Sequence, residues 1–238
     1  MNSKEIIEEL KSESSEKYKA NVVKMGIPEE YSIGVSTTIV RSIAKKIGKS
    51  TELGFELWNT GYHEARLLAV LLFDRKDITH SDIKRLMSDV ISWDLCDHLC
   101  KNLIIKMKDY QDFIFEWITS PHVYEKRASF TLIASSAIHD KKLSNDVLDT
   151  YLKLVRENSD SEHEHIKKAV SWALREIGKI DFSYNEKALL LAHDLKENGN
   201  KVQVWIAKDA MKELENVVKV EGRTRLISTK TKMGSTIS

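Results

Sequence analysis

The segment S-W-D-L-C-D, residues 92–97, places an aromatic ring beside a carboxylate. Trp93 and Asp97 are four positions apart in a segment with helical periodicity, so they are neighbours on one face of a helix. Both lie along one edge of its apolar stripe. A carboxylate beside an indole at the edge of a groove can stabilise a developing positive charge. The structural alternative is that Asp97 caps the helix or pairs with Lys101 or Arg127.

A second tryptophan, Trp172, lies away from the apolar stripe of the helix expected over residues 163–179. At about 100° per residue, it shares the far side of this helix with three cations, Lys168, Arg175 and Lys179. An indole in that position is costly to leave in water. It either packs on a neighbouring repeat or belongs to an aromatic and basic surface that binds nucleic acid, with the cations on phosphates. This helix alone leaves both interpretations open.

Arg127 is the third unusual side chain, because it lies in the middle of the apolar side of the helix expected over residues 122–139. A buried guanidinium needs an anionic partner. That partner is either a nearby carboxylate, as between stacked helical repeats, or a phosphate held in a bidentate fork. Taken alone, this helix favours the carboxylate.

These side chains sit in a sequence with helical periodicity nearly everywhere and almost no strand-like alternation. The expected helices span residues 2–11, 13–25, 36–48, 51–60, 62–73, 79–90, 92–107, 109–119, 122–139, 144–157, 163–179, 184–198 and 200–216. Thr79, Ser144 and Ser183 are the predicted caps of three of them. The connections are short, so sequential helices should be antiparallel neighbours.

Four of the expected helices share an alanine in similar surroundings. The four are Ala65, Ala128, Ala169 and Ala207, separated by 63, 41 and 38 residues. Periods near 40 are typical of HEAT-type repeats, which use about 40–47 residues per unit. We therefore predict an all-α fold, a right-handed α-solenoid of HEAT-like antiparallel helix pairs with a concave face, as a single domain over residues 1–216. A helical bundle is the alternative.

Residues 217–238 differ from this domain because their periodicity is weak and their charge is basic. Five cations face a single acid, Glu221; the cations are Lys219, Arg223, Arg225, Lys230 and Lys232. The segment is either a flexible, frayed tail or a basic arm that contacts phosphates. We expect fraying over the last ten residues.

Composition and missing motifs exclude several classes. The 238 residues carry a formal net charge of +1, so no strong overall field steers the chain toward nucleic acid or membrane. Phosphate-binding glycine loops and zinc-protease motifs are absent from the sequence, and His163 and His165 face different sides of a helix. Cys96 and Cys100 share an apolar stripe, which fits buried thiols in a reducing cytoplasm. We expect no metal, no cofactor, no membrane segment and a monomer.

The chain resembles the AlkD family of DNA alkylation repair glycosylases over roughly residues 15–215. The matching pieces are S-W-D-L-C-D (92–97), K-R-A (126–128), K-K-A-V-S-W-A-L-R-E-I-G-K (167–179), M-G-I (25–27), G-V-S-T-T-I-V-R-S-I-A-K-K-I-G (34–48) and G-Y-H-E-A-R-L-L-A (61–69). Their order and spacing make the resemblance fairly specific.

The resemblance implies HEAT-like repeats that wrap duplex DNA in a basic concave cleft. It implies that Trp93, Asp97 and Trp172 contact the lesion nucleotide and that Arg127 holds the DNA backbone. Family enzymes remove cationic N3- and N7-alkylpurines without flipping the base into a pocket.

Such chemistry suits a sparse site, because an alkylated purine is already a good leaving group. Its departure leaves oxocarbenium character on the sugar, which Asp97 would stabilise while it positions the attacking water. The two indoles would hold the nucleotide by flat contact and cation–π attraction. The competing hypotheses are a non-catalytic HEAT-repeat protein that binds branched or damaged DNA and a protein-interaction scaffold.

Overall fold

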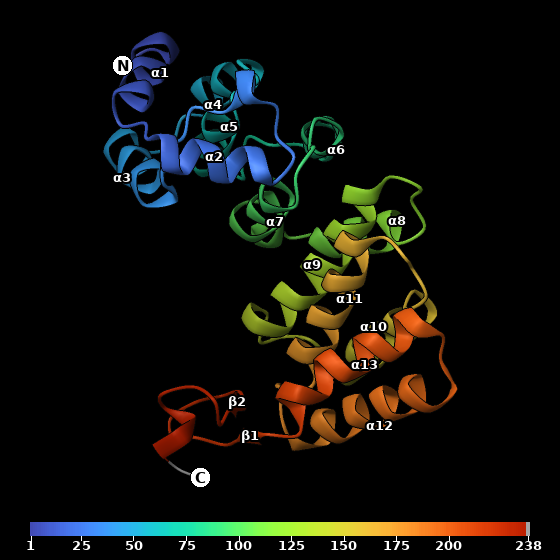
Figure 1. Ribbon diagram of the computed structural model, residues 1–238. Helices are drawn as coiled ribbons and strands as arrows, with labels where there is room; N and C mark the ends of the chain where they lie inside the picture. The colour runs from blue at the N-terminus through green and yellow to red at the C-terminus, as the bar shows by residue number, and fades with distance from the viewer. Residues whose placement is uncertain (237–238) are drawn as a thin grey trace. The chain divides into compact units, whose positions relative to one another are not determined.

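The computed structural model describes residues 1–236, and their contacts divide the chain into two compact units, Met1–Tyr110 and Gln111–Ser238. The described residues form thirteen α-helices, and each segment expected to be helical overlaps one of them. Figure 1 shows their arrangement within each unit. The all-α class predicted from the periodicity is therefore confirmed. The division at Tyr110 falls inside the single domain that the sequence predicts over residues 1–216.

Unit 1 consists of short helices, five of which begin at a residue whose side chain caps the helix. The helices are α1 (Ser3–Ser12), α2 (Glu16–Lys24), α3 (Thr37–Ile47), α4 (Thr51–Asn59), α5 (His63–Leu72), α6 (His80–Ser88) and α7 (Trp93–Asn102), with 3-10 turns η1 (Glu29–Tyr31) and η2 (Ile104–Lys106). Thr79 caps α6 as predicted, in a capping box with Asp82. Helix α5 packs against α3, α4 and α7, so it forms the centre of this unit.

Glu64, on α5, fixes the chain segment that precedes α3. Its carboxylate is fully buried and accepts hydrogen bonds from the backbone N–H groups of Ile33, Gly34 and Val35, at 3.0, 2.7 and 3.2 Å. A buried carboxylate is tolerated when its oxygens are satisfied in this way. Glu64 therefore ties a loop to the central helix of unit 1.

The helix predicted over residues 92–107 is shorter in the structure. Helix α7 ends at Asn102, Leu103 leaves the helical conformation, and the chain continues as η2. The Asn102 side chain donates to the carbonyl of His98, 2.9 Å away, so it competes for the helix end. The pattern of apolar residues cannot predict this side-chain hydrogen bond, so it does not predict the early end of the helix.

Unit 2 contains longer helices and one small hairpin. Its elements are α8 (Tyr110–Trp117), α9 (Val123–His139), α10 (Asn145–Glu157), α11 (Glu164–Ile177), α12 (Phe182–Asn198), α13 (Lys201–Leu214), β1 (Val217–Val218), β2 (Ile227–Ser228) and a 3-10 turn η3 (Gly234–Thr236). Figure 1 shows α9 beside α11 and α12 beside α13, in agreement with their contacts. Ser144 caps α10 as predicted, but the predicted cap Ser183 is wrong: Asp181 caps α12, which begins at Phe182.

Contacts at a constant sequence separation mark the repeat in each unit. In unit 2, side chains bond partners 38 residues away; the pairs are Arg127 with His165, Arg156 with Asp194, Ser171 with Asp209 and Lys187 with Asp149. In unit 1 the separation is 31, as in Trp58 with Asp89 and His63 with Asp94. A constant offset is what stacked helix pairs produce, because each repeat contacts its neighbour at equivalent positions.

The segment after α13 is a hairpin anchored to the helices, as far as it is described. Strands β1 and β2 pair antiparallel, and Gly222 supplies the positive φ of 75° in the turn between them. The Leu226 N–H donates to the Lys179 carbonyl at 2.9 Å, and the Leu226 side chain is buried. Strands of two residues leave no alternating pattern, so the sequence predicts only a basic tail here. Its last two residues, 237–238, lie outside the described residues.

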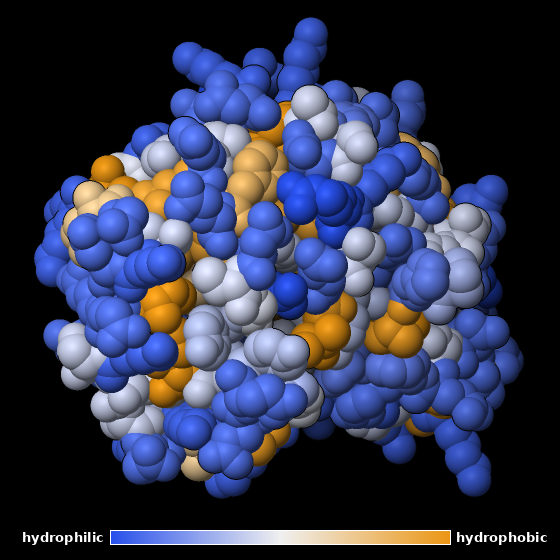
Figure 2. Space-filling view, turned by 90° about the horizontal axis from the view of Figure 1, so that it is seen from above, coloured by the Kyte–Doolittle hydropathy of each residue, from blue (hydrophilic) through white to orange (hydrophobic). Residues whose placement is uncertain are grey.

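Among residues 1–236, none of the helices combines the length and hydrophobicity needed to cross a lipid bilayer. On the face drawn in Figure 2, hydrophobic side chains form patches that hydrophilic side chains interrupt.

Replacing Glu64 with alanine should lower the free energy of unfolding by about 3 kcal/mol or more, because three buried N–H groups lose their acceptor. Urea denaturation followed by circular dichroism measures the change. Glu56→Ala, an exposed site on α4, is the control and should stay within about 0.5 kcal/mol of the parent. Equal stability of the two variants would show that the bonds to Glu64 contribute nothing.

Candidate functional site

Helix α7 carries the tryptophan and the carboxylate that the sequence singles out. Trp93 begins the helix and is 38% exposed, whereas Asp97, one turn later, is 7% exposed. The Asp97 carboxylate lies 4.0 Å from the Lys101 ammonium, one turn further on. Ser92 is the N-cap of α7, so Asp97 does not cap this helix. The structure thus places an exposed indole and a largely covered carboxylate on the same helix.

A His–Asp pair that the sequence analysis missed holds the start of α7. His63 Nε2, on α5, lies 2.8 Å from Asp94 Oδ2, and His63 is 4% exposed. Burial of the Asp94 carboxyl would raise its pKa. The hydrogen bond and charge of His63, with smaller contributions from Ser92 and the Leu95 backbone, together outweigh burial and leave the pKa lowered. The pair links α5 to the helix that carries Trp93 and Asp97. The separation of 31 residues is the only sequence signal for it.

The neighbour of Asp97, His98, is a buried neutral base. Burial, with a smaller contribution from the charge of Arg41, lowers the pKa of His98 to about 4. Its Nε2 therefore carries the proton at neutral pH and donates to the Leu67 carbonyl, 3.0 Å away. His98 joins α7 to α5 and adds no charge beside Asp97.

In unit 2, Arg127 and Trp172 are both held in place by polar groups. Arg127 is 6% exposed, and its Nη1 donates to the carbonyl of His165 at 2.6 Å. Arg127 is thus buried, and a backbone carbonyl on α11 supplies one of its partners. Trp172 is partly exposed on α11, and its Nε1 donates to Glu176 Oε1 at 3.2 Å.

Three cations are predicted to bind DNA: Lys168 and Arg175 on α11, and Lys179 just after its end. Each of these α11 cations lies beside a carboxylate. Lys168 Nζ is 3.0 Å from Glu164, and Arg175 Nη1 is 3.5 Å from Glu213. Lys179 Nζ is 2.7 Å from both Glu176 and Glu213. Glu213 lies on α13, far away in the sequence, so helical periodicity within α11 cannot reveal it. The positive charge of this face is compensated within unit 2, and its DNA-binding role stays a prediction.

Glu176 is the centre of this charge network. Besides Trp172 and Lys179 it binds Arg225 of the hairpin, whose Nη2 lies 2.7 Å from Glu176 Oε2 and 2.7 Å from the Glu176 carbonyl. Burial of Glu176 would raise the pKa of its carboxyl, but Lys179 and Arg225 together outweigh burial and lower it. One of the cations of the predicted basic arm therefore fastens that arm beside Trp172.

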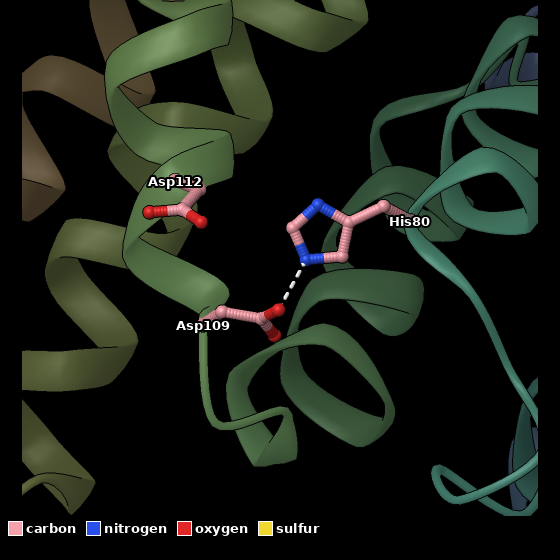
Figure 3. A group of neighbouring side chains, drawn as sticks. All are labelled: His80, Asp109 and Asp112. Atoms are coloured by element: carbon pink, nitrogen blue, oxygen red, sulfur yellow. Dashed lines mark hydrogen bonds and ion pairs between the residues drawn. The ribbon is translucent and has the colours of Figure 1, made fainter.

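The predicted site residues divide between the two units. Trp93 and Asp97 belong to unit 1, whereas Arg127, Trp172 and the α11 cations belong to unit 2. Their convergence on one concave surface stays a prediction. A further titratable pair, His80 and Asp109, lies in unit 1 with 2.6 Å between Nε2 and Oδ2 (Figure 3).

These features define a protein of the all-α class, built from HEAT-like helix pairs with one small hairpin. The family model described as DNA alkylation repair enzyme matches residues 6–214, so the chain belongs to the DNA alkylation repair enzyme family.

The fold is also similar to that of a solved structure at a TM-score of 0.75. That structure is described as a new family of proteins related to the HEAT-like repeat DNA glycosylases with affinity for branched DNA structures. The two share 22% sequence identity, and the match covers 100% of this chain and 92% of the other. The HEAT-like fold predicted from the repeat spacing is thereby confirmed. A search of curated protein sequences gives no match.

Arg225→Ala should lower the free energy of unfolding by about 1–2 kcal/mol and expose the hairpin to proteases, because two hydrogen bonds to Glu176 are lost. Urea denaturation and limited proteolysis measure the two effects. Arg223→Ala is the matched control: it removes the same charge from the same hairpin, but Arg223 is exposed and its Nε contacts only Met233 Sδ. Equal protease resistance of the two variants would contradict the anchoring role.

Glu176→Gln should lower the free energy of unfolding by about 2 kcal/mol at pH 7, because Lys179 and Arg225 lose a charged acceptor. The lowered pKa means that the stabilisation is complete above the ordinary value of 4.5 and is lost as the pH falls through the folded-state value. The difference from the parent should therefore shrink below pH 4.5. Urea titrations across pH measure it, with the exposed Glu186→Gln as control. A difference that is constant with pH would contradict this prediction.

Proposed function

We propose that this protein is a DNA glycosylase that hydrolyses the N-glycosidic bond of cationic N3- and N7-alkylpurines in duplex DNA, without flipping the base. The observation that carries the proposal is the exposed indole of Trp93 one turn from the covered carboxylate of Asp97, in a chain that belongs to the DNA alkylation repair enzyme family. This pair offers a flat surface for a nucleotide and a negative charge beside it.

The reaction breaks the bond between C1′ of the deoxyribose and the ring nitrogen of the purine. The bonding electrons leave with the purine and cancel its positive charge, while positive charge develops on C1′ and the ring oxygen. A water oxygen then bonds to C1′ and releases its proton. No cofactor is needed, because the base already departs as a neutral molecule.

Asp97 is assigned the electrostatic role in this reaction. Its carboxylate is mostly shielded from water, and a fixed charge acts more strongly on a developing cation when the intervening medium is less polar. Trp93 would support the sugar and the lesion by flat contact and cation–π attraction. In unit 2, Trp172 would contact the same nucleotide and Arg127 the DNA backbone, while Lys168, Arg175 and Lys179 would add contacts to phosphates. The protein would act as a monomer.

Burial of Asp97 also supports a second candidate, a non-catalytic protein that binds branched or damaged DNA. A water molecule must approach C1′ near Asp97 in the first proposal, but no such access is needed in the second. The solved structure with the similar fold is described as having affinity for branched DNA. The two candidates differ in one measurable property, which is base release.

The test uses a duplex oligonucleotide with a single N7-methylguanine, and chromatography measures the free base under single-turnover conditions. Asp97→Asn should slow release by a factor of about 100 or more, because a neutral amide cannot offset the developing charge. Asp160→Asn, an exposed carboxylate on the surface of unit 2, is the matched control and should release base at the parent rate.

Circular dichroism and duplex binding show whether Asp97→Asn still folds. An Asp97→Asn variant that releases base at the parent rate would overturn the catalytic assignment. A parent protein that binds a four-way junction tightly and releases no base would establish the second candidate instead.

A further inference from the structure

A cavity of about 540 Å³ lies in unit 1, bounded by the residues after α5, the start of α6, and η2 with the residues that follow it. Four cations line it: Arg75, Lys76, Lys106 and Lys108. All four side chains belong to exposed residues, so they can reach a ligand from solvent. This cavity lies apart from Trp93, at the opposite end of α7.

The charge around the cavity is not compensated by carboxylates. Its one acidic lining residue, Asp109, is 2.6 Å from the imidazole of His80. Within the part of the chain that the structure describes, none of the four cations has a carboxylate at ion-pair distance. This contrasts with the α11 cations, each of which has one.

Two further cations, Lys49 and Arg41, add to the positive field around Lys106. The pKa of Lys106 is lowered by burial and, in decreasing order, by the charges of Lys49, Arg41 and Arg75. A lowered lysine pKa means that the protonated form is disfavoured where it stands. An anion in the cavity would relieve this repulsion.

Two of these cations, Lys49 and Arg75, also have a structural role. Lys49 Nζ donates to the carbonyls of Leu71 and Phe73 at 2.9 and 2.7 Å, and Arg75 Nη1 donates to the Lys106 carbonyl at 2.9 Å. Such bonds satisfy helix-end carbonyls. No bond of this kind involves the ammonium groups of Lys76, Lys106 and Lys108 within residues 1–236, so these three are the groups available to a ligand.

We propose that this cavity binds a phosphodiester of the duplex DNA backbone. The proposal rests on the proposed function and deepens it, since it assigns a second contact to the same partner. The ammonium groups are point charges on flexible stems, which suits sequence-independent contact with phosphate. The Thr79 hydroxyl donates to Asp82 at 2.6 Å, so cations rather than hydroxyl groups supply the attraction.

The position of the cavity determines how far this phosphate contact lies from Trp93. Helix α7 has ten residues, which corresponds to about 15 Å along its axis at about 1.5 Å per residue. A phosphate bound in the cavity therefore lies about 15 Å or more from Trp93, at the other end of α7. The contact therefore adds affinity without touching the lesion.

The test measures the affinity for an unmodified duplex by fluorescence anisotropy as the KCl concentration rises from about 50 to 200 mM. The double variant Lys76→Ala/Lys108→Ala should bind about tenfold more weakly at the lowest salt. Its plot of log affinity against log salt should be shallower by about one, because one phosphate contact is lost. Lys17→Ala/Lys24→Ala, two exposed lysines on α2 of the same unit, is the matched control and should keep the parent slope.

A Lys76→Ala/Lys108→Ala variant with the parent affinity and slope would overturn this inference. Single-turnover base release separates that result from failure of the proposed function. When the duplex is saturating, the variant should release base at the parent rate, since Asp97 is unchanged, while half-saturation needs about tenfold more protein. A parent protein without salt-dependent DNA binding would overturn the proposed function and this inference together.

Discussion

Burial of helix α9 on all sides is the constraint on which unit 2 depends. Every residue from Arg127 to Ala137 is buried, so neighbouring helices must approach it closely. Alanine and serine make this possible, and the hydroxyls of Ser129 and Ser136 donate to carbonyls of their own helix at 2.8 Å each. A guanidinium is tolerated in such a place because Arg127 donates to the His165 carbonyl, which fastens the start of α11 to α9. The helix that carries Trp172 is positioned by this contact.

The helices could be predicted because each one is specified locally. Helices such as α10 carry an apolar stripe and their own cap, Ser144, and both signals lie within a few residues. The contacts that shape the candidate site are specified at a distance. Glu213 neutralises Lys179 across 34 residues, and His63 holds Asp94 across 31, so no local pattern contains both partners. For the same reason, a row of cations away from the apolar stripe predicts neither how exposed each one is nor which carboxylate it meets: Lys168 is exposed, whereas Lys179 is largely covered.

Pairing of charges distinguishes the α11 cations from the cations around the cavity of unit 1. The formal net charge of +1 suggests a molecule with little attraction for polyanions. That average hides two different arrangements. The cations of α11 lie beside carboxylates of α11 and α13 and bind helices to one another, whereas those around the cavity of unit 1 face no carboxylate within ion-pair distance among the described residues. An exposed pair contributes little to an external field, because its charges cancel within a few ångströms. Attraction for a phosphate backbone should therefore be stronger at the cavity than at the helix whose sequence looks more basic.

The position of Asp97 within α7 bears on whether this carboxylate stabilises the start of the helix or a charge outside it. A carboxylate that serves the start of a helix lies at the N-cap or in the first turn. Ser92 and Asp94 hold those positions, and Asp94 is itself held by His63. Asp97 lies beyond them and is largely buried, where an ionised group is costly unless positive charge is near. Lys101 supplies such a charge in the free protein, although at 4.0 Å and on an exposed side chain. In the proposed reaction, a cationic purine nucleotide would add a further positive charge while it is bound. The position of Asp97 therefore fits the electrostatic role proposed for it better than a role in starting its own helix.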